Sequence, residues 1–192
     1  MNVSFKAYRI SDANIYRINQ DNSHEPIKAS FVELQPVSNF DVNAADKFAE
    51  LCGQDYEALA QNIAYDLDNM FFDKDRTKRF FAVTRQMCNF DKLDPYEIMG
   101  TMETLIDEAN QHTIAYLKVA PEYAYADIDR TIKGVGASLI KPLQNKLLLG
   151  KRIFVDILES AKGFYENMGF QQIKGNRYMY DPKINHSLMR YV

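Results

Sequence analysis

Two glycines separated by one residue, Gly134 and Gly136, stand directly before an amphipathic helical pattern in a chain with only 8 glycines among 192 residues. The first turn of a helix exposes N–H groups that lack intrahelical partners, and glycine lets an anion approach the backbone closely. A strand, a glycine pair and a helix in this order therefore indicate an α/β fold and a site for a phosphate group. The same glycines would also suit a tight turn without any ligand. The apolar residues that form the helical pattern are Leu139, Ile140, Leu143 and Leu147.

The charge balance argues against a general nucleic-acid-binding protein. Lys and Arg total 23 against 26 Asp and Glu, which gives a net charge of −3 and a pI of about 5.6, whereas nucleic-acid binding calls for a concentrated basic surface. The 2 cysteines and 3 histidines are scattered without metal-ligand spacing, so we expect no metal. The N-terminus does not resemble a signal peptide and no apolar stretch approaches the length of a membrane span, so we expect a cytoplasmic protein without membrane partners.

Hydrophobic periodicity predicts one α/β (α+β) domain over residues 29–192, preceded by an N-terminal arm or hairpin at 1–28. Asp41 or Asn43 is predicted to cap the first helix, and Gly53 to end it. Pro142 interrupts the helix after the glycine pair and predicts a kink. The predicted strands are 29–37, 80–85, 97–106, 113–120, 152–158, 171–173 and 177–180. The predicted helices are 41–52, 55–71, 161–168 and a helix that opens at the glycine pair and ends at Gly150.

A second informative segment, residues 159–170, follows the strand predicted at 152–158. Ser160 is predicted to cap a short helix there and Gly169 to end it. Phe164 and Phe170 would anchor this helix in the core, and Tyr165 would project from a different face. A role for Tyr165 as an ordinary core or rim aromatic competes with a chemical role, since the chain has 12 tyrosines.

Three blocks in this order resemble the GCN5-related N-acetyltransferase (GNAT) superfamily. They are Val119-Ala120-Pro121-Glu122-Tyr123, Lys133-Gly134-Val135-Gly136-Ala137, and Ala161…Phe164-Tyr165…Gly169-Phe170. Two departures stand out: Thr131 occupies the position of an Arg or Gln in the family pattern, and residues 124–130 form an insertion. The resemblance implies a mixed, mostly antiparallel central sheet flanked by helices, in which the fourth and fifth strands splay apart.

The resemblance further implies that acetyl-CoA or another acyl-CoA is the donor and that an amine is the acceptor. Tyr165 matches the family's general acid, which protonates the leaving thiolate, and a backbone N–H near Val119 would stabilise the charge on the carbonyl oxygen. The general base is open between Glu103 and Glu122, for each of which simple surface solvation is the competing fate, with His112 as a third option. The residues implied in binding the acyl-CoA are Leu117, Val119, Thr131, Ile132, Lys133, Gly134, Val135, Gly136, Ala137 and Ser160.

Two other functions stay open at this stage. One is a catalytically weak CoA-binding or interaction module with the same fold, and the other is a tRNA-directed acetyltransferase toxin, which would use the basic cluster Lys74, Arg76, Lys78 and Arg79. Residues 1–28 would serve as an oligomerisation arm, giving a homodimer, or as a lid. An aromatic, mildly acidic pocket for a cationic amine would draw on Tyr56, Tyr65, Asp66, Asp68, Phe71, Phe72, Tyr178 and Tyr180. The same residues would equally suit the core and the surface.

Overall fold

The computed structural model describes residues 6–53, 57–69, 78–107, 109–124 and 131–184. The strands are β1 (Tyr8–Asp12), β2 (Ile15–Ile18), β3 (His24–Ile27), β4 (Ser30–Leu34), β5 (Lys78–Thr84), β6 (Ile98–Ile106), β7 (His112–Val119), β8 (Ile132–Lys133), β9 (Ile153–Asp156), β10 (Phe170–Lys174) and β11 (Arg177–Tyr180). The α-helices are α1 (Asn39–Leu51), α2 (Glu57–Asn69), α3 (Pro121–Ala124), α4 (Val135–Pro142) and α5 (Lys162–Asn167). Shorter helical turns lie at Pro95–Glu97, Leu143–Leu147 and Glu159–Ala161.

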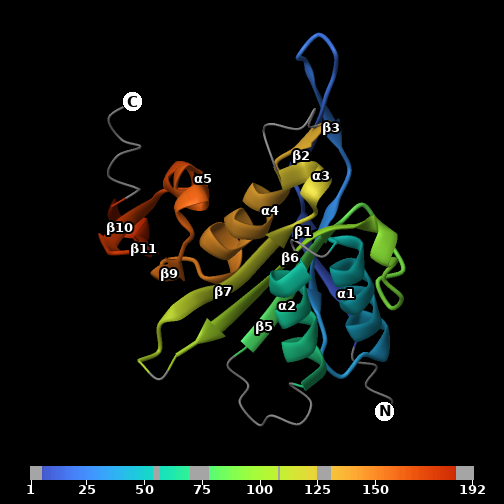
Figure 1. The fold of residues 1–192 in the computed structure, drawn as a ribbon, viewed down its shortest axis with the longest axis horizontal. Helices are drawn as coiled ribbons and strands as arrows, with labels where there is room; N and C mark the ends of the chain where they lie inside the picture. The colour runs from blue at the N-terminus through green and yellow to red at the C-terminus, as the bar shows by residue number, and fades with distance from the viewer. Residues whose placement is uncertain (1–5, 54–56, 70–77, 108, 125–130, 185–192) are drawn as a thin grey trace.

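Eight strands form one central sheet in the order β1-β4-β5-β6-β7-β9-β11-β10 (Figure 1). Every pair of neighbours in this sheet is antiparallel except β7 and β9, which run parallel. The predicted mixed, mostly antiparallel sheet flanked by helices is confirmed. The predicted fourth and fifth strands are β7 and β9.

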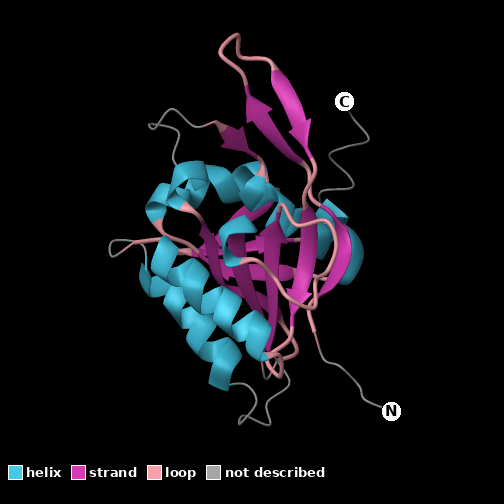
Figure 2. Ribbon diagram, turned by 90° about the vertical axis from the view of Figure 1, so that its right-hand side faces the viewer, coloured by secondary structure: helices cyan, strands magenta, loops and turns pink. Residues whose placement is uncertain are grey.

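Helices cover both faces of the sheet (Figure 2). Successive side chains of a strand point to opposite faces, so each strand contributes to both of these layers. In β5, Phe80 packs in the cluster under α1 and α2, while the next residue, Phe81, packs in the cluster under α4. Both phenylalanines are essentially inaccessible to solvent. A sheet buried on both sides makes its central strands apolar on both faces, so a charged side chain on β5, β6 or β7 needs a partner or a function.

The N-terminal residues contribute to both sheets of the molecule. β1 pairs with β4 at the edge of the central sheet, and β2 and β3 form a hairpin that pairs with β8 in a second, three-stranded sheet. This hairpin projects beyond the helices at the top of the view (Figures 1 and 2). Residues 13–18 thereby lie against the segment that contains the glycine pair.

Three predictions about helix ends are wrong in detail. The cap of α1 is Ser38, whose hydroxyl accepts the Asp41 N–H at 3.3 Å, rather than Asp41 or Asn43. Ser160 does not cap α5, because α5 begins at Lys162 after Ala161 and has no side-chain cap. The helix after the glycine pair does not run unbroken to Gly150: α4 includes Pro142 as its last residue and continues as a π-helical turn.

None of the helices in the described part of the chain has the length and apolar character that crossing a membrane requires. Both cysteines are free; Cys52 is buried and Cys88 is exposed. Within the described residues, no group of three His, Cys, Asp or Glu side chains is arranged to hold a metal ion.

Candidate active site

The parallel strands β7 and β9 stay paired over only three residue pairs. The pairing ends at Ile114, opposite Val155, although β7 continues to Val119. At the same level the register between β7 and β6 shifts by one residue. Glu103 lies opposite Tyr116, but the next residue, Thr104, lies opposite Ile114. Ala115 is therefore an extra residue that forms a β-bulge in β7. A bulge bends a strand and increases its local twist. The bulge therefore accounts for the splay of β7 away from β9 that the family resemblance implies.

Beyond the bulge, one edge of β7 faces the gap. In an antiparallel ladder, residues that bond to one neighbouring strand alternate with residues that bond away from it. The N–H of Ala120 donates to Met99 O of β6 at 2.9 Å, which places Leu117 and Val119 in the set directed away from β6, toward β9. Their N–H and C=O groups are thus the ones that an extended ligand in the gap would meet.

The glycine pair forms the start of α4. Gly134 is the N-cap residue with φ +94° and makes no side-chain cap, so the first-turn amides of α4 receive no side-chain acceptor. A Cβ on Gly134 would lie 2.6 Å from Asn14 O, while Ser138 Oγ donates to that same oxygen at 3.1 Å. Glycine is therefore required at position 134 by its backbone angle and by the close approach of the N-terminal hairpin.

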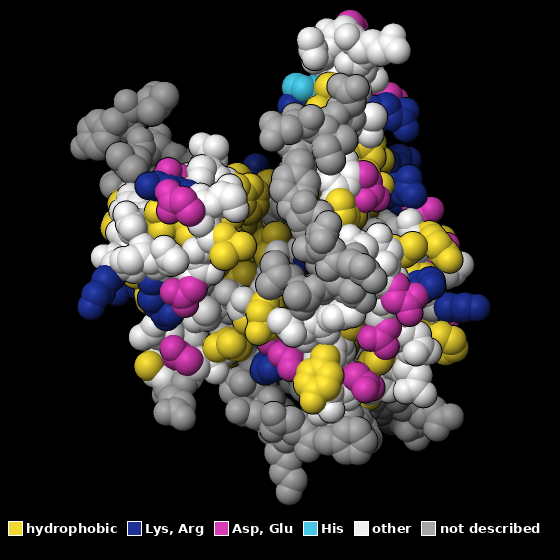
Figure 3. Space-filling view, viewed as in Figure 1, with side chains coloured by type: hydrophobic (Ala, Val, Ile, Leu, Met, Phe, Trp, Pro, Cys, Tyr) yellow, Lys and Arg dark blue, Asp and Glu magenta, His cyan; other side chains and the backbone are white. Residues whose placement is uncertain are grey.

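Gly136 brings the three sequence blocks into contact. A Cβ on this glycine would lie 3.0 Å from Phe164 Cζ and 3.6 Å from Val119 Cγ2. The start of α4, the end of β7 and α5 thus meet at one point. In Figure 3 the surface is hollowed beside α5, over α4, and hydrophobic side chains gather in this hollow.

The residues just before the glycine pair are partly engaged by the hairpin. Ile18 N–H donates to Thr131 O at 2.8 Å and Lys133 pairs with Tyr16, which leaves the amide of Ile132 directed away from β2. Lys133 Nζ lies 2.7 Å from Nε2 and 3.0 Å from Nδ1 of His24. The three-stranded sheet does not use the N–H groups of Ile132 or of Val135 to Ala137. Within the segment predicted to bind the acyl-CoA, these are the backbone donors that can face a ligand.

Tyr165 lies in the core, so the alternative role of an ordinary core aromatic stays compatible with its position. It is 7% exposed, and its ring makes edge contacts with Phe164 and Phe170 at centroid distances of 5.1 and 5.5 Å. Burial alone raises the pKa of its phenol above the usual value. A phenol that stays protonated at all physiological pH values can serve as a proton or hydrogen-bond donor, but not as a base.

Glu103 on β6 is buried, which rules out simple surface solvation for it. Its side chain is 1% exposed, and Lys78 Nζ lies 3.4 Å from Oε1. Among the described residues, Oε2 has no hydrogen-bond partner. Burial raises the pKa of Glu103 to about 7, and the Lys78 charge acts in the opposite direction.

The other candidates for the base lie in less suitable places. Glu122 is exposed on α3 directly after β7. His112 lies at the opposite end of β7 from Val119, where β7 and β9 are still paired, and burial together with Lys151 and Arg79 lowers its pKa. Ser160, predicted to contact the acyl-CoA, is exposed in the turn before α5.

Two residues beside Glu103 carried no signal for that site in the sequence. Asp66 accepts a hydrogen bond from Lys78 at 2.7 Å, and both flank the Glu103 carboxylate from α2 and β5. They are far apart in the sequence and share no motif. Tertiary packing alone brings them together.

The basic cluster considered for RNA is neutralised where the structure describes it. Lys78 is held by Asp66, and Arg79 makes two hydrogen bonds of 2.9 and 2.7 Å with Glu33. Lys74 and Arg76 lie outside the described residues, as does most of the predicted insertion at 124–130.

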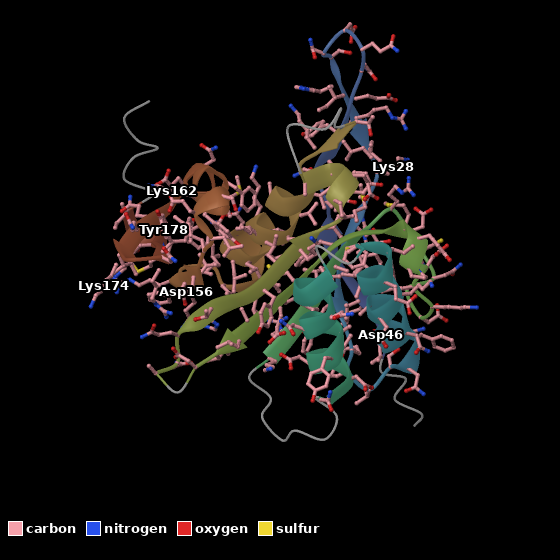
Figure 4. The ribbon with its side chains drawn as sticks, viewed as in Figure 1. Lys28, Asp46, Asp156, Lys162, Lys174 and Tyr178 are labelled. Atoms are coloured by element: carbon pink, nitrogen blue, oxygen red, sulfur yellow. The ribbon has the colours of Figure 1, made fainter. Side chains whose placement is uncertain are left out.

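The aromatic pocket predicted for an amine is not assembled as one site. Tyr178 is 2% exposed in the core, Tyr65 is 68% exposed on α2, and Tyr56, Phe71 and Phe72 lie outside the described residues. Asp68 and Tyr65 instead line an open groove of about 510 Å³ between α1 and α2, together with Asp46. Figure 4 places Asp46 on the opposite side of the view from Lys162 and Tyr178, so this groove is separate from the gap between β7 and β9.

The fold is similar to solved acetyltransferase structures. A proposed acetyltransferase from an Exiguobacterium species superposes with a TM-score of 0.54 and 16% identity, covering 83% of this chain and 97% of that one. A proposed GNAT-family acetyltransferase from Desulfovibrio desulfuricans gives 0.54 and 14%, covering 80% and 98%. A GNAT-family acetyltransferase from Staphylococcus aureus gives 0.52 and 15%, with the same coverage of 80% and 98%.

No family model matches the sequence, and no curated protein matches it significantly. The likeness therefore lies in the structure, which has the fold of the GNAT acetyltransferases.

Proposed function

We propose that this protein is an N-acyltransferase that moves an acetyl or other acyl group from acyl-CoA to a primary amine of a small molecule or protein. The observation that carries the proposal is the convergence at Gly136, where the free edge of β7, the uncapped start of α4 and the helix that carries Tyr165 meet. A strand edge, a set of helix amides and a buried proton donor are the three parts that such a transfer needs.

The acyl-CoA fits these parts through the backbone. The N–H and C=O groups of Leu117 and Val119 would pair with the amides of the pantetheine arm, as an added strand does. The amides from Val135 to Ala137, with that of Ile132, would bind the pyrophosphate, because helix N-termini favour negative charge. Backbone donors make the site compatible with the chain's acidic balance.

The side chains divide the proton transfers between them. When bound, the donor supplies a thioester whose carbonyl carbon is open to attack by a neutral amine. Glu103 accepts one proton from the acceptor ammonium so that the nitrogen has a free electron pair. Tyr165 gives its phenolic proton to the departing sulfur and regains one as the new amide nitrogen loses its second proton. Each turnover thus releases one proton to water.

Two measurements test this function separately. Calorimetric titration with acetyl-CoA and CoA reports binding, and thiol release in the presence of a panel of primary amines reports turnover. Binding without release of thiol for any amine would favour the CoA-binding module over the enzyme. Absence of binding would refute both.

Tyr165→Phe tests the chemical step. We expect kcat to fall by about a hundredfold to ten-thousandfold, because a positioned proton donor contributes on that order, while the Kd for CoA changes little. Tyr178→Phe is the matched control, since this tyrosine is equally buried in the neighbouring sheet strand β11. Equal kcat values for the two variants would remove Tyr165 from the mechanism.

A further inference from the structure

The face of β6 that lies under α2 holds two buried polar atoms that lack a hydrogen-bond partner among the described residues. They are Oε2 of Glu103 and Oγ1 of Thr101. Both side chains are 1% exposed, and because they are two positions apart on one strand they point to the same side of the sheet. Buried polar groups are paired as a rule, because an unpaired one has lost its hydrogen bonds to water without a replacement. Such atoms on a site strand indicate a polar ligand or a function.

Glu103 is placed at the level where the gap opens. It pairs with Tyr116, directly next to the bulge at Ala115. Cross-strand neighbours of this kind have Cβ atoms about 5 Å apart. The carboxylate therefore lies one strand away from the point at which β7 leaves β9.

Two oppositely charged side chains flank the carboxylate and lead outward from it. Lys78 Nζ lies 3.4 Å from Glu103 Oε1 and 2.7 Å from Asp66 Oδ2. The Lys78 and Asp66 side chains are 32% and 24% exposed, while Glu103 is closed off. The three groups thus run from the buried strand to the surface beside α2.

We propose that Asp66 and Lys78 are positioning residues for Glu103, which hold its carboxylate beside the β7 bulge and adjust, by opposite charges, how readily it accepts a proton. This inference rests on the proposed function, because it assigns the base of that reaction to Glu103 rather than to Glu122. The proton that Glu103 takes from the acceptor ammonium returns to water past Asp66 and Lys78. No electron transfer or further reactant is involved.

The charges around Glu103 predict opposite changes in its pKa for two substitutions. Lys78 lowers the pKa of Glu103 and Asp66 raises it, while burial is the largest influence. The other elements packed on this face present Tyr116 and Lys118 from β7 and Phe80 from β5. Lys78→Met should raise the pKa of Glu103, and Asp66→Asn should lower it, since the latter also leaves Lys78 entirely to Glu103.

The test measures the acid limb of the pH profile of kcat/KM in the full chain. Lys78→Met should move this limb upward and Asp66→Asn should move it downward, each by about one pH unit, which is about tenfold in rate on the limb. Lys78→Arg should restore the position of the limb, because it keeps the charge. If the two variants shift the acid limb in the same direction, or not at all, the proposal is overturned. Loss of packing alone would not move the limb in opposite directions in the two variants.

A second measurement tests the interactions of Glu103 with Asp66 and Lys78 independently of enzyme activity. Titration of the Glu103 carboxyl by carbon NMR, identified by its absence in Glu103→Gln, should show the same opposite shifts without any substrate. If the wild-type chain transfers no acyl group, the proposed function fails while the NMR titration still reports on the network. If the NMR shifts appear but the rate profile ignores them, the network exists and Glu103 is not the base.

Discussion

At the scale of single residues, burial decides which polar side chains can do chemistry. Burial raises the pKa of both Glu103 and Tyr165: it is the only cause for Tyr165 and the largest cause for Glu103, to which the charge of Asp66 adds. The sequence identified Tyr165 as a candidate by its motif, but it did not distinguish Glu103 from Glu122 as the general base. The apolar residues of β6 could have distinguished the two glutamates. A central strand that is apolar on both faces is buried on both faces, so its glutamate is buried as well.

Asp41 shows the same effect in a structural role. It is fully buried at the start of α1, its Oδ2 accepts the Gln35 N–H at 2.8 Å, and its Oδ1 has no partner among the described residues. Burial raises its pKa from 3.8 to about 6. A carboxyl with a raised pKa in the folded state favours folding below its unfolded pKa, and this contribution is lost as the pH rises through about 6.

We therefore predict that Asp41→Asn flattens the pH dependence of stability. The free energy of unfolding of the wild type minus that of the variant should fall by about 2 to 3 kcal/mol between pH 4 and pH 8. Urea unfolding at the two pH values measures this difference. The exposed Asp91→Asn is the control, and a wild-type-minus-variant difference that is the same at both pH values would contradict the assignment.

At the scale of elements, periodicity located the strands and helices well but not their ends. The strand at β4 and the helix at α2 were predictable because their apolar residues repeat at the expected spacing. The α1 cap was not, because Ser38, Asp41 and Asn43 are all capping residues, and the fold decides which of them stands at the helix start. The partners of the glycine pair, Asn14 and Phe164, come from distant parts of the chain and had no local signal.

The two glycines at the start of α4 give the element-scale prediction. Gly134→Ala should lower the free energy of unfolding by about 2 kcal/mol or more, because alanine is strained at φ +94° and its Cβ would meet Asn14 O at 2.6 Å. Gly150→Ala separates the two causes: it shares a positive φ of +77° but has no atom within 4 Å of the added Cβ.

Thermal and urea unfolding of both variants measure the difference. Gly134→Ala should be clearly the less stable of the two. If both variants lose the same stability, the close approach of the hairpin at Asn14 contributes nothing, and backbone strain alone explains the requirement for glycine.

At the scale of the whole molecule, the sheet separates two kinds of surface. The α4 and α5 side holds the glycine loop and Tyr165, and the α1 and α2 side holds Glu103 with Asp66 and Lys78. The proposed function places the acyl transfer at the gap between β7 and β9. A donor held on one side and an acceptor arriving from the other would meet there, which is why the splay of two strands is central to the account.

The most direct test is a crystal structure of the protein with acetyl-CoA. We predict that the pantetheine amides bond to the backbone of Leu117 and Val119, that the pyrophosphate lies on the amides of Val135 to Ala137, and that the sulfur lies within hydrogen-bond distance of the Tyr165 hydroxyl. A complex in which acetyl-CoA occupies another surface, with the β7 edge and the start of α4 untouched, would contradict the account.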